Sequence, residues 1–171
     1  MNKKIDVKKL TILSMFATFS IILSYVEVLI PFNIGVYGFK IGLANIATVV
    51  IIYLYGCKEA FAITFVRILI ISMLFGTAFS FAFSLAGGVV SVAIMCLIKK
   101  YLKTHIIFTS AIGGITHNLA QILVASWIVS SKGILSLIPL LVILGLVTGI
   151  VVGIVGFIIY GRVKKYIRRF V

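Results

Sequence analysis

Acidic residues are almost absent from this sequence of 171 residues, which contains only Asp6, Glu27 and Glu59. Magnesium-dependent diphosphate chemistry requires clustered carboxylates that hold the metal against phosphate oxygens. No such cluster occurs, and the sequence also lacks the Gly-x-x-x-x-Gly-Lys-Ser/Thr loop that binds nucleotide phosphates. No serine or cysteine nucleophile lies in a recognisable motif. We therefore expect neither an enzyme nor an ATPase, and we expect no metal or other cofactor.

Charge of either sign is also scarce. Only 11% of the residues are charged and 63% are hydrophobic, with a mean hydropathy of +1.31. A soluble domain keeps about a quarter of its residues charged because its surface faces water. This composition instead predicts an all-α, polytopic membrane protein, since helices satisfy their own backbone hydrogen bonds in lipid.

Cysteine occurs only at Cys57 and Cys96. Two cysteines are too few for a disulfide scaffold or a thiolate metal site. Both fall at the predicted inner ends of helices, and we expect them to be reduced.

The long apolar runs predict a bundle of six transmembrane helices that forms a single domain over residues 1–171. A helix needs roughly 20 apolar residues to cross the hydrocarbon core. One helix through 41–75 would be too long and would carry Lys58 and Glu59 near its middle, so a tight turn is expected there. The six predicted spans are 10–30, 41–56, 60–75, 79–98, 106–129 and 134–160.

Basic residues give the sequence a net charge of +13 and lie in short clusters between the apolar runs. This pattern is typical of membrane topology rather than of nucleic-acid binding, which gathers charge on one folded face. With the N-terminus inside, 13 basic residues are cytoplasmic. The predicted external loops contain only Lys40 and Lys132. Six spans with both termini in the cytoplasm follow from this bias.

Glycine repeats every fourth residue in the last span, at Gly145, Gly149 and Gly153. This spacing lets a neighbouring backbone approach closely, which drives helix association in lipid. Two interpretations are open: close packing within this bundle, or docking against another membrane subunit.

Three ionisable residues fall within the predicted spans, and such residues are costly there unless they serve a function. They are Glu27, Arg67 and His117. A Glu27–Arg67 ion pair is feasible from the predicted depths, and its role would then be structural. Together with nearby polar residues they predict a substrate-binding pocket in the outer half of the bundle. The predicted substrate-binding residues are Glu27, Lys40, Asn45, Arg67, His117, Asn118 and Gln121.

The chemistry of this predicted pocket favours an anionic or phosphorylated ligand, because Lys40, Arg67 and His117 would give it a positive lining. Residues 31–40 form the longest external loop, which either folds over the pocket as a lid or rests at the level of the lipid headgroups. His117 and Gln121 are four residues apart, and Asn118 and Gln121 are three apart, so we expect all three to lie on one helical face.

Three short motifs, in this order and spacing, resemble a family of small bacterial membrane proteins. The family is called the Gx transporters and is also labelled heptaprenyl diphosphate synthase component I. The resemblance covers nearly the whole chain. The motifs are Lys40-Ile41-Gly42-Leu43-Ala44-Asn45-Ile46, Phe83-Ser84-Leu85-Ala86-Gly87-Gly88 and His117-Asn118-x-x-Gln121.

That family is similar to the S components of energy-coupling factor (ECF) transporters, six-helix bundles that capture a vitamin or related nutrient from outside the cell. The resemblance implies a multi-pass protein of the bacterial plasma membrane. It also implies a coupling membrane protein and two ATPase subunits as partners. Docking on the coupling protein would then use small residues four apart on the first span, here Ser14 and Thr18.

Three functions remain open at this point. The first is a substrate-capture subunit of an importer, with a small molecule and membrane lipids as its other partners. The second is a non-catalytic accessory subunit in isoprenoid or quinone metabolism. The third is a small channel or a transporter that works alone.

Overall fold

The computed structural model of the chain describes residues 7–29 and 42–169. Every secondary-structure element in these residues is a helix, which confirms the all-helical prediction. The elements are α1 (Val7–Leu29), α2 (Asn45–Leu54), α3 (Cys57–Phe75), α4 (Ala78–Leu102), α5 (Ile106–Val129), the short 3₁₀ helix η1 (Lys132–Leu137) and α6 (Ile138–Arg169).

Four stretches are long and apolar enough to cross a membrane: α1, α4, α5 and the segment Gly133–Ile167. The other two helices differ from these. α2 has 10 residues, so it is only about 15 Å long. α3 carries Lys58, Glu59 and Arg67 in its 19 residues. The described residues thus form six α-helices besides η1. Six membrane crossings and their orientation stay a prediction.

Local sequence sets the helix ends. Thr77 precedes α4, and its hydroxyl accepts a hydrogen bond from the backbone N–H of Ser80, as an N-cap residue does. Gly56 separates α2 from α3 with a φ of +118°, a conformation that favours glycine. Pro139 lies in the first turn of α6, where its missing N–H costs nothing.

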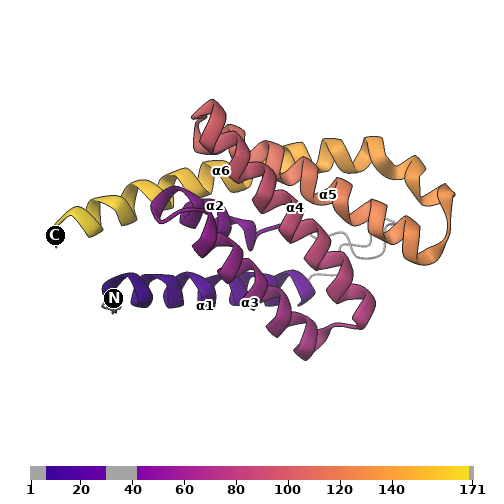
Figure 1. Ribbon diagram of the computed structural model, residues 1–171, viewed down its shortest axis with the longest axis horizontal. Helices are drawn as coiled ribbons and strands as arrows, with labels where there is room; N and C mark the ends of the chain where they lie inside the picture. The colour runs from indigo at the N-terminus through magenta and orange to yellow at the C-terminus, as the bar shows by residue number, and fades with distance from the viewer. Residues whose placement is uncertain (1–6, 30–41, 170–171) are drawn as a thin grey trace, which may run out of the picture.

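The helices run alternately up and down, and the basic segments meet at one end of the bundle (Figure 1). At this end the ammonium of Lys9 on α1 donates to the carboxylate of Glu59 on α3 at 2.5 Å. At the opposite end, the rings of Tyr25 and Phe75 contact each other, with centroids 5.0 Å apart. α1 and α3 are therefore parallel neighbours.

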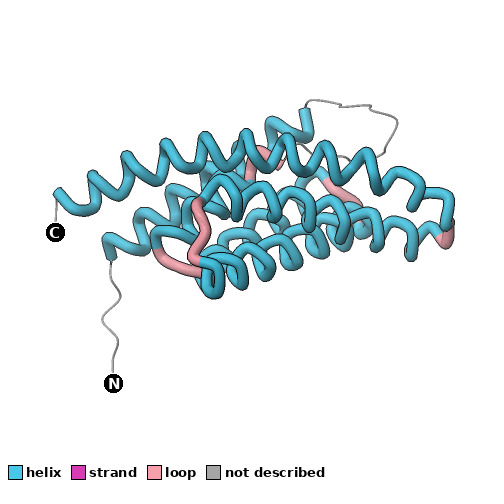
Figure 2. Tube along the Cα trace, turned by 90° about the horizontal axis from the view of Figure 1, so that it is seen from above, coloured by secondary structure: helices cyan, strands magenta, loops and turns pink. Residues whose placement is uncertain are grey.

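The short helix α2 lies at the centre of the molecule and contacts all five other α-helices. Its residues Val49, Val50, Ile51 and Ile52 have no exposed surface. Figure 2 shows the longer helices arranged alongside one another, and the connections from α3 to α4 and from α4 to α5 are short. At the basic end, Lys99 of α4 donates to the backbone carbonyl of Ile52 at 2.5 Å, a favourable place for a cation at a helix C-terminus.

The glycines of α6 face α5. A Cβ atom on Gly145 would lie 2.7 Å from the carbonyl oxygen of Gly114, and one on Gly149 would lie 2.7 Å from that of Ser110. A Cβ on Gly153 would lie 2.8 Å from the Cα of Ile107. The backbones of α5 and α6 thus touch along this stripe. The stripe is therefore packed against α5 within the bundle, which agrees with the first of the two interpretations.

The two cysteines correct an expectation from the sequence. The structure joins Cys57 and Cys96 in a disulfide, whereas we expected both to be reduced. Cys57 is the first residue of α3, and the tight turn after α2 places it against the last third of α4. Only the packing of α3 on α4 brings the two side chains together.

Candidate functional site

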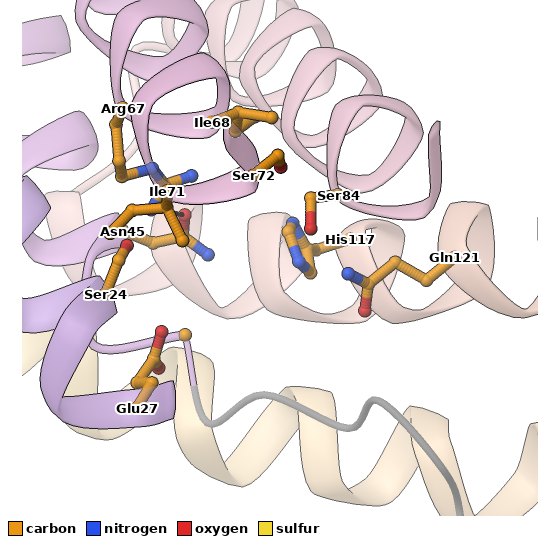
Figure 3. A pocket seen from close by; sticks show the side chains of 11 residues that line it. Ser24, Glu27, Asn45, Arg67, Ile68, Ile71, Ser72, Ser84, His117 and Gln121 are labelled. Carbon is orange, nitrogen blue, oxygen red and sulfur yellow. Dashed lines mark hydrogen bonds between the residues drawn. The ribbon is translucent and has the colours of Figure 1, made fainter. Parts of the chain in front are cut away.

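A pocket lies where five elements converge: α1, the N-terminus of α2, α3, α4 and α5 (Figure 3). Its volume is about 30 Å³, which is room for a small polar group. Most of its lining side chains are polar or charged. The lining residues are Ser24, Glu27, Gly42, Asn45, Arg67, Ile68, Ile71, Ser72, Ser84, His117 and Gln121.

The carboxylate of Glu27 is bound at the N-terminus of α2. Its Oε1 accepts a hydrogen bond of 2.6 Å from the backbone N–H of Leu43. The preceding Gly42 has a φ of +83°, which lets the chain turn tightly into the helix. A helix N-terminus carries partial positive charge, so α2 stabilises the negative charge of Glu27 inside the bundle.

Arg67 brings a positive charge into the same pocket from α3. The residue is only 6% exposed, and Glu27 interacts with it electrostatically. Its one hydrogen bond to the described residues is a long one, 3.5 Å from Nη1 to the Oδ1 of Asn45. A guanidinium has five N–H donors. Arg67 therefore retains donors for a ligand, and in Figure 3 its guanidinium points into the pocket.

His117 and Gln121 form the other end of the pocket, on α5. In Figure 3 the hydroxyl of Ser84 points toward His117, and the amide nitrogen of Gln121 points the same way. That nitrogen is buried and makes no hydrogen bond within the described residues. Gly87 of α4 makes room for both side chains, because a Cβ there would lie 2.7 Å from Cγ of Gln121 and 2.9 Å from Cε1 of His117.

The predicted site residues divide into three groups. Glu27, Asn45, Arg67, His117 and Gln121 come together in the pocket. Asn118 does not line it: its Nδ2 donates to the carbonyl of Leu141 on α6 at 2.9 Å, so it joins two helices. Adjacent residues of a helix point about 100° apart, which turns Asn118 away from His117. Lys40 and the predicted lid over 31–40 lie outside the described residues.

Several lining residues were missed by reasoning from sequence. Ser24 lies one helical turn before Glu27, and Ser72 follows Arg67 by five residues. A serine in an apolar helix gives little signal of its own, because its hydroxyl can bond to the helix backbone. Gly42 and Ser84 fall within the recognised motifs but were not assigned to the pocket.

The predicted docking residues on α1 are placed on its outer face. Ser14 and Thr18 are both exposed, and the hydroxyl of Thr18 donates to the carbonyl of Ser14 at 3.0 Å. Within the described residues nothing covers this stripe, in contrast to the glycines of α6.

The described residues give the pocket hydrogen-bond donors and two formal charges. These charges, on Arg67 and Glu27, balance, so the described residues alone do not form the positive lining predicted from the sequence, to which Lys40 would also contribute. Across the described part of the chain, no group of three or more His, Cys, Asp or Glu residues could hold a metal ion. Hydrogen-bond donors converge on a small buried space, which suits a compact polar or anionic group.

The fold and the pocket together define the class of this protein: an all-helical bundle whose long apolar helices are compatible with a membrane, built around a buried polar pocket. The chain belongs to the heptaprenyl diphosphate synthase component I family, whose sequence profile matches residues 16–158. No curated protein sequence matches it significantly. The family match agrees with the resemblance found from the three motifs.

Proposed function

We propose that this protein is the substrate-binding membrane subunit of an importer of the energy-coupling factor type. In this role it captures a small anionic, isoprenoid or vitamin-like ligand from the outer side of the bacterial plasma membrane. The observation that carries the proposal is the pocket, where Arg67 and Gln121 direct N–H donors into one buried space that Asn45 also lines. Five elements that are distant in sequence build it, as expected of a ligand site.

The chain supplies binding groups but no means of driving transport. Its sequence holds no nucleotide-binding loop, so the energy for uptake would come from partner ATPases. The exposed face of α1 around Ser14 and Thr18 is the surface we assign to the coupling membrane protein. A catalytic role is not part of the proposal, because the single aspartate in the sequence, Asp6, cannot build the carboxylate cluster that diphosphate chemistry requires.

Reconstitution with a coupling protein and its ATPase pair tests this function. Copurification of the three partners and ATP-dependent uptake are expected. The ligand would be identified beforehand by native mass spectrometry of the gently purified chain. Failure to engage these partners, under conditions in which a known S component does, would contradict the proposal.

The pocket is tested separately by Arg67→Ala and His117→Ala. Each is expected to lower retention of the ligand at least tenfold while the bundle stays folded. Arg162→Ala is the matched control, since Arg162 is an exposed cation near the end of α6. Unchanged affinity in both pocket variants would remove these residues from the site.

A second function is favoured by the name of the family, which denotes a component of a synthase. In this alternative the chain is a membrane accessory subunit that holds a lipid-like intermediate for a soluble prenyl synthase. Deletion of the protein would then change the length or yield of the prenyl product without any defect in uptake.

A further inference from the structure

We propose that the pocket and an apolar groove on the outside of α3 and α4 form one binding site for a single-chain amphiphile. Its compact carboxylate head would lie beside Arg67 and its aliphatic tail in the groove. This inference rests on the proposed function, in that it takes the pocket as the ligand site. It adds the chemical class of the ligand and the route by which its tail leaves the pocket.

The groove between α3 and α4 has a volume of about 350 Å³. It is lined by Phe61, Phe65, Leu85 and Val89, among others, and its open surface has no polar atoms. Phe65 is 49% exposed and Val89 is 42% exposed, so the groove opens on the surface that a bilayer would cover. Such a groove suits an aliphatic chain and would not hold a polar molecule.

Ile68 connects the two spaces, because it lines both the polar pocket and the groove. Its side chain rests against Gly88 of α4, where a Cβ would lie only 2.7 Å from Cδ1 of Ile68. The hydroxyl of the adjacent Thr64 is turned inward and bonds to that of Thr48 at 3.1 Å. Ile68 is therefore the side chain that separates the pocket from the groove, and its displacement by a ligand would join the two spaces.

The sizes of the two spaces define the shape of the ligand. The pocket, at about 30 Å³, has room for a carboxylate but not for a diphosphate, which is several times the size of a water molecule. The groove holds roughly a dozen water-sized volumes. That suits one chain of about ten carbon atoms rather than the two long chains of a phospholipid.

The hydrogen-bond donors in the pocket select the head group. Glu27 balances the charge of Arg67, but the guanidinium makes only one hydrogen bond to the described residues, to Asn45, so its other N–H donors can bind a ligand. Arginine binds a carboxylate through two parallel N–H donors. The buried amide nitrogen of Gln121, which has no hydrogen-bond partner in the described residues, provides a further donor to the same space.

Photolabelling of the full chain in phosphatidylcholine nanodiscs tests the proposal. The probe is a decanoate analogue with a diazirine at the end of its tail. We expect the label to map to the groove between α3 and α4, and unlabelled decanoate to reduce it at least tenfold. Decanol, which lacks the charge, and geranyl diphosphate, with its larger head, are expected to compete at least tenfold more weakly.

Two variants probe the two parts of the site. Arg67→Ala removes the partner of the head and Leu85→Trp fills the groove, and each should lower labelling at least tenfold. Leu97→Trp is the matched control, since Leu97 is 50% exposed on α4 and does not line the groove. Leu85→Trp leaves the polar pocket intact. If Arg67→Ala does not fold, the groove is therefore still tested by Leu85→Trp.

Three results would overturn the proposal. Labelling spread evenly over the lipid-facing helices and undiminished by decanoate would show ordinary lipid contact. Equal competition by decanol would remove the role of the charge, and stronger competition by geranyl diphosphate would contradict the compact head. Groove labelling without partner-driven uptake would contradict only the importer role, whereas uptake without groove labelling would contradict only this inference.

Discussion

The pocket depends on a residue that has no side chain, Gly87. A Cβ at this position would press on both Gln121 and His117. We expect Gly87→Ala to weaken ligand retention at least tenfold and to lower the free energy of unfolding by about 1–3 kcal/mol, as overpacking does. Ligand retention by native mass spectrometry and thermal unfolding in detergent would measure the two effects.

Gly161→Ala is the control for this substitution, because no heavy atom lies within 4 Å of a Cβ placed there. Gly161 lies within α6, so alanine should stabilise that helix by about 0.5–1 kcal/mol. Unaltered ligand retention in Gly87→Ala would show that binding does not require the positions that Gln121 and His117 occupy in this structure.

Asn118 and His117 are adjacent in sequence and should respond in opposite ways to substitution. Asn118→Ala removes the hydrogen bond to Leu141 and is expected to lower the free energy of unfolding by about 0.5–2 kcal/mol. It should leave ligand affinity unchanged, whereas His117→Ala should abolish binding with a smaller effect on stability. Thermal unfolding and ligand binding of the two variants would be measured in parallel. Loss of binding in Asn118→Ala, or loss of stability without loss of binding in His117→Ala, would contradict these assignments.

At the scale of the helices, α2 explains how a charged pocket can exist inside the bundle. The helix is too short to cross a membrane alone, so its N-terminus lies inside the structure and not at its surface. There it presents the N–H of Leu43 to Glu27 and Asn45 to Arg67. A broken or shortened helix whose positive end faces a binding site is a recurring device in membrane transporters.

The pairing of α1 with α3 at the basic end should make stability depend on pH. The hydrogen bond from Lys9 holds the pKa of Glu59 below its usual value of 4.5. A lowered pKa in the folded state stabilises the protein above pH 4.5, and this contribution is lost as the pH falls through the lowered pKa. Glu59→Gln should therefore cost about 0.2–1 kcal/mol at pH 7, because the pair is partly exposed.

The difference in unfolding free energy between Glu59→Gln and the native protein should disappear in acid, below the folded pKa of Glu59. Thermal unfolding of both proteins in detergent at neutral and acidic pH measures it. Arg162→Gln provides the comparison, since arginine stays charged throughout this range and its loss should be independent of pH. A constant difference between Glu59→Gln and the native protein at all pH values would mean that the ion pair with Lys9 has no role.

At the scale of the whole molecule, the basic segments meet at one end of the bundle and η1 lies at the other. The positive-inside rule predicts that the basic end faces the cytoplasm. This orientation can be tested with single cysteines introduced in a Cys57→Ser/Cys96→Ser background. An impermeant maleimide added to intact cells should label Ser136→Cys, in η1, but should label Lys164→Cys, near the end of α6, only after the membrane is permeabilised. The reverse pattern, or labelling of both in intact cells, would contradict the predicted orientation.

The positions of the helices were largely readable from the sequence. The predicted fifth span, 106–129, coincides with α5. The expected turn between α2 and α3 is present, but it lies at Gly56, and the predicted turn residues 57–59 begin α3 instead. Apolar runs bounded by glycines and basic residues carry this information locally, because each helix satisfies its own backbone hydrogen bonds. The polar residues within the runs also marked five of the eleven residues that line the pocket, since a buried polar group in an apolar helix requires a partner.

Helix rotation and contacts between distant segments were decided only by the tertiary structure. Rotation separates His117 from Asn118, covers the glycine stripe of α6 with α5, and brings Ile68 between the pocket and the groove. The disulfide between Cys57 and Cys96 likewise depends on how α3 packs against α4. In an almost uniformly apolar sequence the hydrophobic pattern does not specify which face turns inward, so close packing around small residues makes that choice.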